Sequence, residues 1–166
     1  NCHQISGVQV QEARTDSRVA YTYVGLFGYT TGVLQDVVYQ MPDTLAVTSA
    51  GSSVTRYVGG LVGYNGGTIT NCAAYNVQLK AEGYQYSTLY LGGLVGRNAG
   101  AIRRSAAEGA AITANTSLSN AFAGGLVGIN ENVGSVDQCY AVGKVSANRG
   151  RYGEVYACGF AGRSEG

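Results

Sequence analysis

The sequence has a single histidine, His3, and a single proline among its 166 residues, and only 13% of the residues are charged. One histidine excludes an HExxH metal site, a Ser/His/Asp triad and any histidine cluster, and no enzyme activity is expected. The net charge is +1 and no Lys or Arg run exceeds Arg103-Arg104, so nucleic acid is not an expected partner. No apolar run approaches the roughly 18 residues that span a bilayer, so no membrane insertion is expected.

Cysteine is also scarce, with four residues that form no CxxC pair or comparable ligand spacing. We therefore expect no metal site and no cofactor. Cys2, Cys72 and Cys139 occupy one position of the repeat described below, with Val37 and Ser105 between them. In stacked repeats these cysteines would lie about 9.5 Å apart, beyond the ~7 Å limit for a disulfide. They are expected to be small buried residues.

Glycine, in contrast, is abundant at 26 of 166 residues, against an ordinary share of about 7%. Many of these glycines belong to five copies of one pentapeptide: VGLFG at 24–28, GGLVG at 59–63, 92–96 and 124–128, and CGFAG at 158–162. The anchors Gly25, Gly60, Gly93, Gly125 and Gly159 are spaced by 35, 33, 32 and 34 residues. This period of about 33 residues indicates a single repeat domain over residues 1–166.

Other residue types recur in step with the anchors. The columns are an apolar one of Leu26, Leu61, Leu94, Leu126 and Phe160, a polar one of Thr30, Asn65, Asn98, Asn130 and Ser164, and an aromatic one of Tyr57, Tyr90, Phe122 and Tyr156. Short β-type runs separated by Gly and Asn, without a 3.6-residue period, predict strands and turns. One unit cannot bury its apolar face alone, whereas stacked units can. The sequence therefore predicts an all-β parallel β-solenoid of about five coils, with polar segments such as 82–88 and 115–120 projecting as loops.

The columns allow both structural and binding interpretations. Asn65, Asn98 and Asn130 are expected to form a structural ladder between coils, in preference to a sugar-binding row. Leu61, Leu94 and Leu126 are expected to form the apolar ladder beside it. The aromatic column Tyr57, Tyr90, Phe122 and Tyr156 is the candidate glycan-binding site, although packing beneath the loops is the preferred interpretation.

The copies GGLVGYNGGTITNC, GGLVGRNAGAIRRS and GGLVGINENVGSVDQC resemble the GLUG repeat of bacterial surface proteins. This resemblance implies an extracellular or cell-surface location, in adhesins or in non-catalytic regions of surface proteases such as immunoglobulin A proteases. It implies no catalytic residue. The first and last copies differ from the pattern, because Val24 and Cys158 replace the first glycine and Ala161 replaces valine.

Asn1-Cys2 aligns with Asn71-Cys72, and Gly166 aligns with Gly67, so both ends are expected to fall within a coil. Uncapped coil ends would expose strand edges. The sequence therefore predicts a structural or adhesive segment, whose partners are neighbouring repeats or further copies stacked head to tail into a filament. A module for host or matrix glycans is the first alternative. A polysaccharide-acting β-helix enzyme is a weaker one, because the acidic residues are scattered across columns.

Overall fold

The computed structural model describes residues 3–5, 7–8, 20–49 and 53–165, and these residues form β-strands and turns. Within these described residues, twenty-one strands make up four sheets, and every pairing inside the sheets is parallel. No helix long and apolar enough to cross a membrane is found in the described part of the chain. The all-β parallel β-solenoid expected from the repeat is thereby confirmed.

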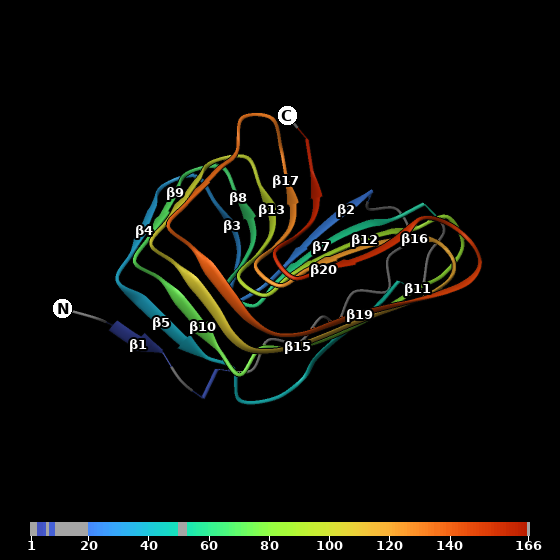
Figure 1. Cartoon of the computed structure of the whole chain (residues 1–166), viewed down its shortest axis with the longest axis horizontal. Coiled ribbons are helices and arrows are strands. Elements are labelled where there is room, and N and C mark those ends of the chain that lie inside the picture. The colour runs from blue at the N-terminus through green and yellow to red at the C-terminus, as the bar shows by residue number, and fades with distance from the viewer. Residues whose placement is uncertain (1–2, 6, 9–19, 50–52, 166) are drawn as a thin grey trace.

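Sheets B and C hold five strands each. Sheet B contains β2 (Tyr21–Val24), β7 (Thr55–Gly59), β12 (Thr88–Gly92), β16 (Asn120–Gly124) and β20 (Val155–Cys158). Sheet C contains β3 (Phe27–Thr30), β8 (Val62–Asn65), β13 (Val95–Asn98), β17 (Val127–Asn130) and β21 (Ala161–Ser164). The GGLVG pentapeptides form the sharp corners that lead from sheet B into sheet C (Figure 1).

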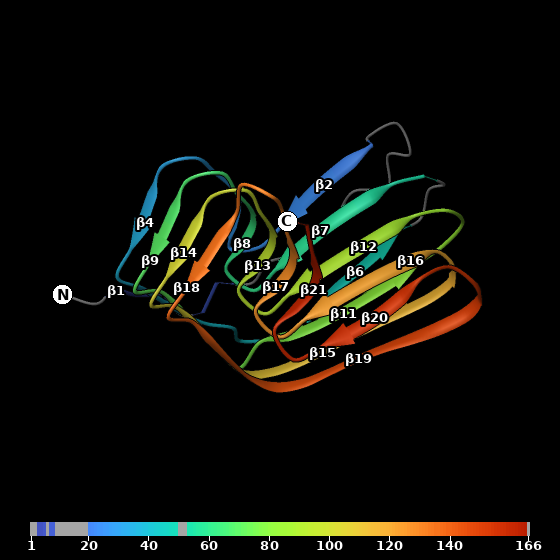
Figure 2. The ribbon, with the colours of Figure 1, turned by 45° about the horizontal axis from the view of Figure 1, so that its top comes forward.

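Sheets D and A complete each coil. Sheet D contains β4 (Val33–Gln35), β9 (Thr68–Thr70), β14 (Ala101–Arg103) and β18 (Ser135–Asp137). Sheet A contains β1 (His3–Ile5), β5 (Val37–Gln40), β6 (Leu45–Ser49), β10 (Ala73–Tyr75), β11 (Gln78–Gly83), β15 (Ala106–Leu118) and β19 (Tyr140–Tyr152). Each coil therefore runs through sheets B, C, D and A before it returns to sheet B (Figures 1 and 2).

The stack makes about four turns, slightly fewer than the five expected. Sheet D has four strands where sheets B and C have five, because the five pentapeptide corners enclose only four D-sheet connections. Strand pairing follows the columns of the sequence: Tyr57 pairs with Tyr90 and Asn65 with Asn98. The 33-residue period thus sets the register of all four sheets.

In cross-section the coil has a rounded lobe and a flat arm (Figure 1). The lobe is bounded by sheets C and D and the first part of sheet A. The arm consists of the remaining part of sheet A, which runs outward, and sheet B, which returns (Figures 1 and 2). Leu61, Leu94 and Leu126 are fully buried in the lobe, and one apolar core continues from the lobe into the arm.

The arm corrects part of the loop prediction. Residues 84–87 do form a turn at the arm tip, but residues 115–118 continue β15 as a regular strand paired with β19. Their burial alternates, since Ala114 and Thr116 face the core while Ser117 is exposed. Gly109, with a φ of 64°, stands at a register shift between β15 and β19, where β15 passes from lobe to arm. The polar composition of residues 115–118 therefore led to a loop prediction, although these residues extend sheet A into the two-layered arm.

Candidate functional site

The corner between sheets B and C brings two rows of outward-facing side chains together. Glycines make this possible, because a methyl group at Gly59 would lie 2.0 Å from the Val62 carbonyl oxygen and 2.7 Å from the Gly96 amide nitrogen. Similarly, a methyl group at Gly63 would lie 2.6 Å from the Val24 amide nitrogen. The outer faces of the two sheets thus touch backbone to backbone at the corner. Larger side chains fill the space just beyond it.

We call this filled space the aromatic seam. Its first row, from sheet B, is Tyr23, Tyr57, Tyr90, Phe122 and Tyr156. Its second row, from sheet C, is Tyr29, Tyr64, Arg97, Ile129 and Arg163. Tyr57, Tyr90, Phe122 and Ile129 form a hydrophobic cluster separate from the core, with Tyr23 packed against it.

The rings of the first row stack face to face along the solenoid axis. The ring centroids are 5.4, 5.1, 5.0 and 5.6 Å apart from Tyr23 to Tyr156, and the interplanar angles lie between 8° and 17°. Such offset or parallel pairs add about 0.5–1.5 kcal/mol each to the hydrophobic contribution. Because both faces of Tyr57, Tyr90 and Phe122 are used in stacking, only their edges remain for other contacts.

The second row closes over those edges with planar and charged groups. Tyr29 and Tyr64 stack at 4.5 Å, and the Arg97 guanidinium lies 5.1 Å from the Tyr57 centroid and 5.2 Å from the Tyr64 centroid. Arg97 also forms an ion pair with Glu131, at 2.6 Å between nitrogen and oxygen. These contacts hold the cation against the Tyr57 and Tyr64 rings.

At the C-terminal end of the seam, Arg163 lies 5.5 Å from the Phe122 centroid and donates a hydrogen bond to the Tyr90 hydroxyl at 3.4 Å. An ion pair with Glu165, at 2.9 Å, keeps it in place.

Burial changes the acid–base properties of the seam. Desolvation raises the pKa of Tyr57 to about 12, and the nearby Arg97 cation opposes this shift. Desolvation likewise raises the pKa of Tyr90. Tyr57 and Tyr90 are therefore neutral at physiological pH, and they act as packing groups and hydrogen-bond partners.

The four aromatic residues predicted as a binding column lie together but differ in exposure. Tyr57, Tyr90 and Phe122 are only 7%, 7% and 4% exposed, whereas Tyr156 is 51% exposed. Beside Tyr156 lies an open hollow of about 390 Å³, lined by Phe122, Glu154, Tyr156, Gly162 and Arg163. The geometry leaves only this end of the column open to a ligand.

The second row went unrecognised in the sequence. Its residues immediately precede the polar column, at the x of GGLVGxN, and four of the five carry planar side chains. This recurrence was the available signal. The signal was hard to see because Tyr, Arg and Ile belong to different chemical classes.

The asparagine column forms a continuous ladder inside the lobe. Asn65 donates a hydrogen bond from Nδ2 to Oδ1 of Asn98 at 2.8 Å, and Asn98 donates to Oδ1 of Asn130 at 2.7 Å. Asn98 Oδ1 also accepts a hydrogen bond from the Gly100 amide. Because Asn65 and Asn98 are fully buried, their amides are not available to a sugar.

The cysteines behave as packing residues. Cys72 is buried one position after the D-to-A corner, and Cys139 and Cys158 are free thiols that are only partly buried. Cys2 lies outside the described residues. Within the described ranges, no group of three or more His, Cys, Asp or Glu side chains is placed to hold a metal ion.

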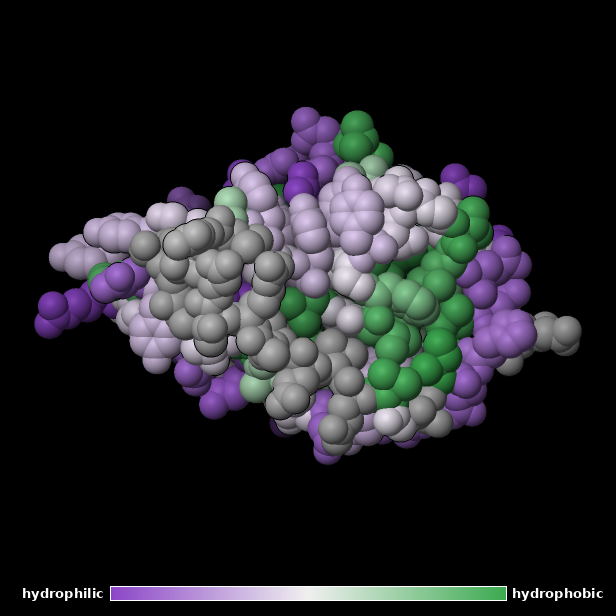
Figure 3. Space-filling model, turned by 180° about the vertical axis from the view of Figure 1, so that it is seen from behind, coloured by the Kyte–Doolittle hydropathy of each residue, from purple (hydrophilic) through white to green (hydrophobic). Residues whose placement is uncertain are grey.

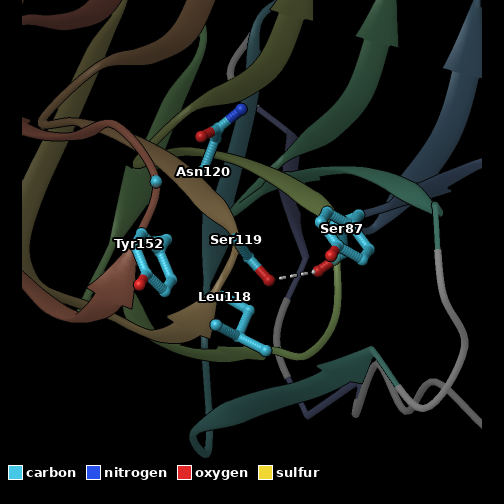
Figure 4. A pocket seen from close by; sticks show the side chains of 7 residues that line it. Ser87, Leu118, Ser119, Asn120 and Tyr152 are labelled. Atoms are coloured by element: carbon cyan, nitrogen blue, oxygen red, sulfur yellow. Dashed lines mark hydrogen bonds between the residues drawn. The ribbon is translucent and has the colours of Figure 1, made fainter.

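A second hollow, of about 350 Å³, lies at the arm tip, where β15 and β19 turn back toward sheet B. Its lining residues are Tyr86, Ser87, Leu118, Ser119, Asn120, Tyr152 and Gly153 (Figure 4). The hydroxyl oxygens of Ser87 and Ser119 are 3.0 Å apart and hydrogen-bonded, while Tyr86 and Tyr152 are 79% and 69% exposed. The hollow thus combines fixed polar groups with open aromatic rings.

Comparison with known families gives one match. The family model of the GLUG motif matches residues 50–75 and 115–146, which confirms the resemblance seen in the pentapeptides. No curated protein and no solved structure matches the chain. The motif and the β-solenoid together fit a structural repeat segment.

Proposed function

We propose that the chain is a non-catalytic structural segment of a bacterial cell-surface protein, in which coils of the same kind continue the stack. The extracellular location is supported by the GLUG motif, which is typical of surface adhesins. The structural role is supported by the geometry. The interior columns are fully occupied by packing residues and by the asparagine ladder.

The observation that carries this proposal is the exposure of core columns at the end faces. Leu126 is fully buried in an inner coil, whereas its successor Phe160 in the last coil is 40% exposed. At the other face, Leu34 is half-buried, whereas its successor Ile69 is fully buried. Figure 3 looks onto that face and shows hydrophobic residues gathered in one band. Apolar surface of this kind marks an interaction site, and another coil is its natural complement.

Duplication of one inner coil tests the structural role. Inserting a second copy of residues 93–124 after Gly124 should lengthen the particle by about 5 Å and leave its unfolding cooperative, because each coil contacts only its neighbours. Small-angle scattering and thermal unfolding measure both quantities. A variant that unfolds or loses cooperativity would contradict a freely extendable stack.

Protease treatment of intact producing cells tests the location. We expect the segment to be released or cleaved from the cell exterior, while a cytoplasmic marker stays intact. Protection of the segment until the cells are lysed would refute the surface assignment. It would leave the stacking proposal unaffected.

A glycan-binding role is the second candidate, and the arm-tip hollow favours it over the buried part of the aromatic column. Exposed rings beside hydroxyl and amide groups are what a sugar requires. Tyr86→Ala and Tyr152→Ala should each abolish binding on a glycan array if the hollow is used, with Tyr140→Ala as the matched exposed control. Unchanged glycan binding in both hollow variants would exclude the site.

A further inference from the structure

At both end faces of the stack, side chains of the aromatic seam lack the neighbours that the same positions have in the inner coils. Inside the molecule, a first-row ring is covered by the second-row side chain of the following coil: Tyr64 contacts Tyr23, Arg97 covers Tyr57 and Arg163 covers Phe122. Among the described residues, no second-row side chain covers Tyr156. The hollow of about 390 Å³ lies beside it.

The N-terminal face of the stack carries the kind of aromatic side chain that is missing over Tyr156. Tyr23 and Tyr29 begin the two rows of the seam, and Tyr29 is 57% exposed. The first row would accept another ring on Tyr156 at the same spacing of about 5 Å seen between Tyr90 and Phe122. In the second row, the Arg163 guanidinium would lie against a tyrosine ring, as the Arg97 guanidinium lies against the Tyr64 ring.

We propose that a second copy of this chain docks its N-terminal face on the C-terminal face, so that β2 and β3 of the second copy pair with β20 and β21. The second copy's Tyr23 then stacks on Tyr156. Its Tyr29 enters the hollow and contacts the Arg163 guanidinium. This inference rests on the proposed stacking role and adds the partner and the contacts.

The backbone at both faces fits this arrangement. All strand pairs within sheets B and C are parallel, so edge strands β20 and β21 can accept β2 and β3 in the same orientation. In inner coils the anchor glycine lies tightly against the next coil, since a methyl group at Gly93 or Gly125 would lie 2.1 Å from a carbonyl oxygen. No described atom lies within 4 Å of the same position on Gly159. That open position is the space a further coil would occupy.

The contact joins two different faces and continues the strand stacking along the solenoid axis, so it generates an open filament and no closed ring. Sheets B and C contribute five strands per copy, so each added copy should advance the filament by about 24 Å. Electron microscopy of the purified full chain at high concentration measures this rise directly.

A charge exchange tests the contact itself. Arg163→Glu should weaken association about tenfold or more, because a carboxylate repels the tyrosine ring that a guanidinium attracts. Tyr29→Arg should weaken it similarly, because two guanidinium groups would then face each other. The double variant should recover association through an ion pair between copies, as measured by sedimentation velocity. Lys80→Glu, on an inner strand of the arm, is the charge-matched control.

Gly159→Ala separates folding from assembly. The added methyl group meets no described atom in the single chain, so thermal stability should be unchanged at low concentration. In the filament it would collide with the incoming backbone, so fibres should be lost. Fibres that form equally well with Gly159→Ala would contradict the proposed register.

Three further outcomes overturn the proposal: monomers at every concentration, fibres insensitive to Arg163→Glu, or a double variant as weak as the single ones. None of them affects the coil-duplication experiment, which tests stacking within one chain. A positive duplication result with a monomeric chain would therefore retain the structural role and eliminate the second copy as partner.

Discussion

Asn71 donates a hydrogen bond from Nδ2 to Oδ1 of Asp36 at 2.6 Å, and both residues adopt left-handed backbone conformations, with φ of 53° and 57°. They occupy the corner between sheets D and A. The hydrogen bond from Asn71, together with a weaker one from Gln35, lowers the pKa of Asp36. Arg104 and Gln138 hold the same corner in later coils, with φ of 47° and 52°.

Arg104→Asn should stabilise the protein by about 1 kcal/mol, because a left-handed conformation is strained for most side chains and tolerated by asparagine. Arg104 is exposed, so the substitution removes little packing. Chemical denaturation at neutral pH measures the gain. Arg103→Asn, one residue earlier on regular strand β14, should give no gain, and equal effects of the two variants would contradict the explanation.

Tyr57→Phe should reduce the alkaline loss of stability. The pKa of Tyr57 is raised by burial to about 12 from an unfolded value of 10.0, so the fold favours the neutral phenol. This contribution is complete below pH 10 and is lost as the pH rises toward 12. The variant lacks the titrating group and keeps the ring, as Phe122 does in the same column. Denaturation curves at pH 8 and 11 should therefore differ less in the variant than in the parent chain.

Gly92→Ala should destabilise the fold by about 3 kcal/mol. Its methyl group would lie 1.9 Å from the Val95 carbonyl oxygen and 2.6 Å from the Gly128 amide nitrogen, so the corner would have to open. Gly32→Ala is the control, since no described atom lies within 4 Å of its methyl position. A mild effect at Gly92, similar to that at Gly32, would show that the B-to-C corner is more adaptable than its geometry indicates.

Asn98→Ala should cost about 2–4 kcal/mol, because Asn65 Nδ2 and Asn130 Oδ1 would each lose a buried partner. Ser164→Ala, in the same column at the exposed last coil, should have little effect. Thermal unfolding of the two variants provides the comparison. Equal shifts would indicate that water replaces the missing amide inside the lobe.

Most of the fold could be predicted from the sequence because a repeat of constant length aligns chemically equal residues. Tyr57, Tyr90 and Phe122 had to share a column, and a slip of one residue would turn each of them into the core. The Asn65–Asn98–Asn130 ladder was predictable for the same reason. The columns did not reveal how far each strand runs, since Thr116 and Ser117 resemble loop residues although they belong to β15.

The candidate site was predictable only in part. The first row of the seam is uniformly aromatic, and four of its five residues were therefore predicted, while Tyr23 was missed. The covering role of Arg97 and Arg163 depends on the sharp corner at Gly59 and Gly63, which folds the outer face of one sheet against that of the next. No local pattern encodes that three-dimensional contact, because the partners Arg97 and Tyr57 belong to different coils.

The aromatic seam also bears on how such a chain changes length over evolutionary time. Each ring contacts mainly the rings above and below it, and those positions recur with every pentapeptide corner. Recombination between two corners would add or remove a whole coil and bring one equivalent ring against another. The stack can therefore be lengthened or shortened in single-coil steps without a new interface having to evolve.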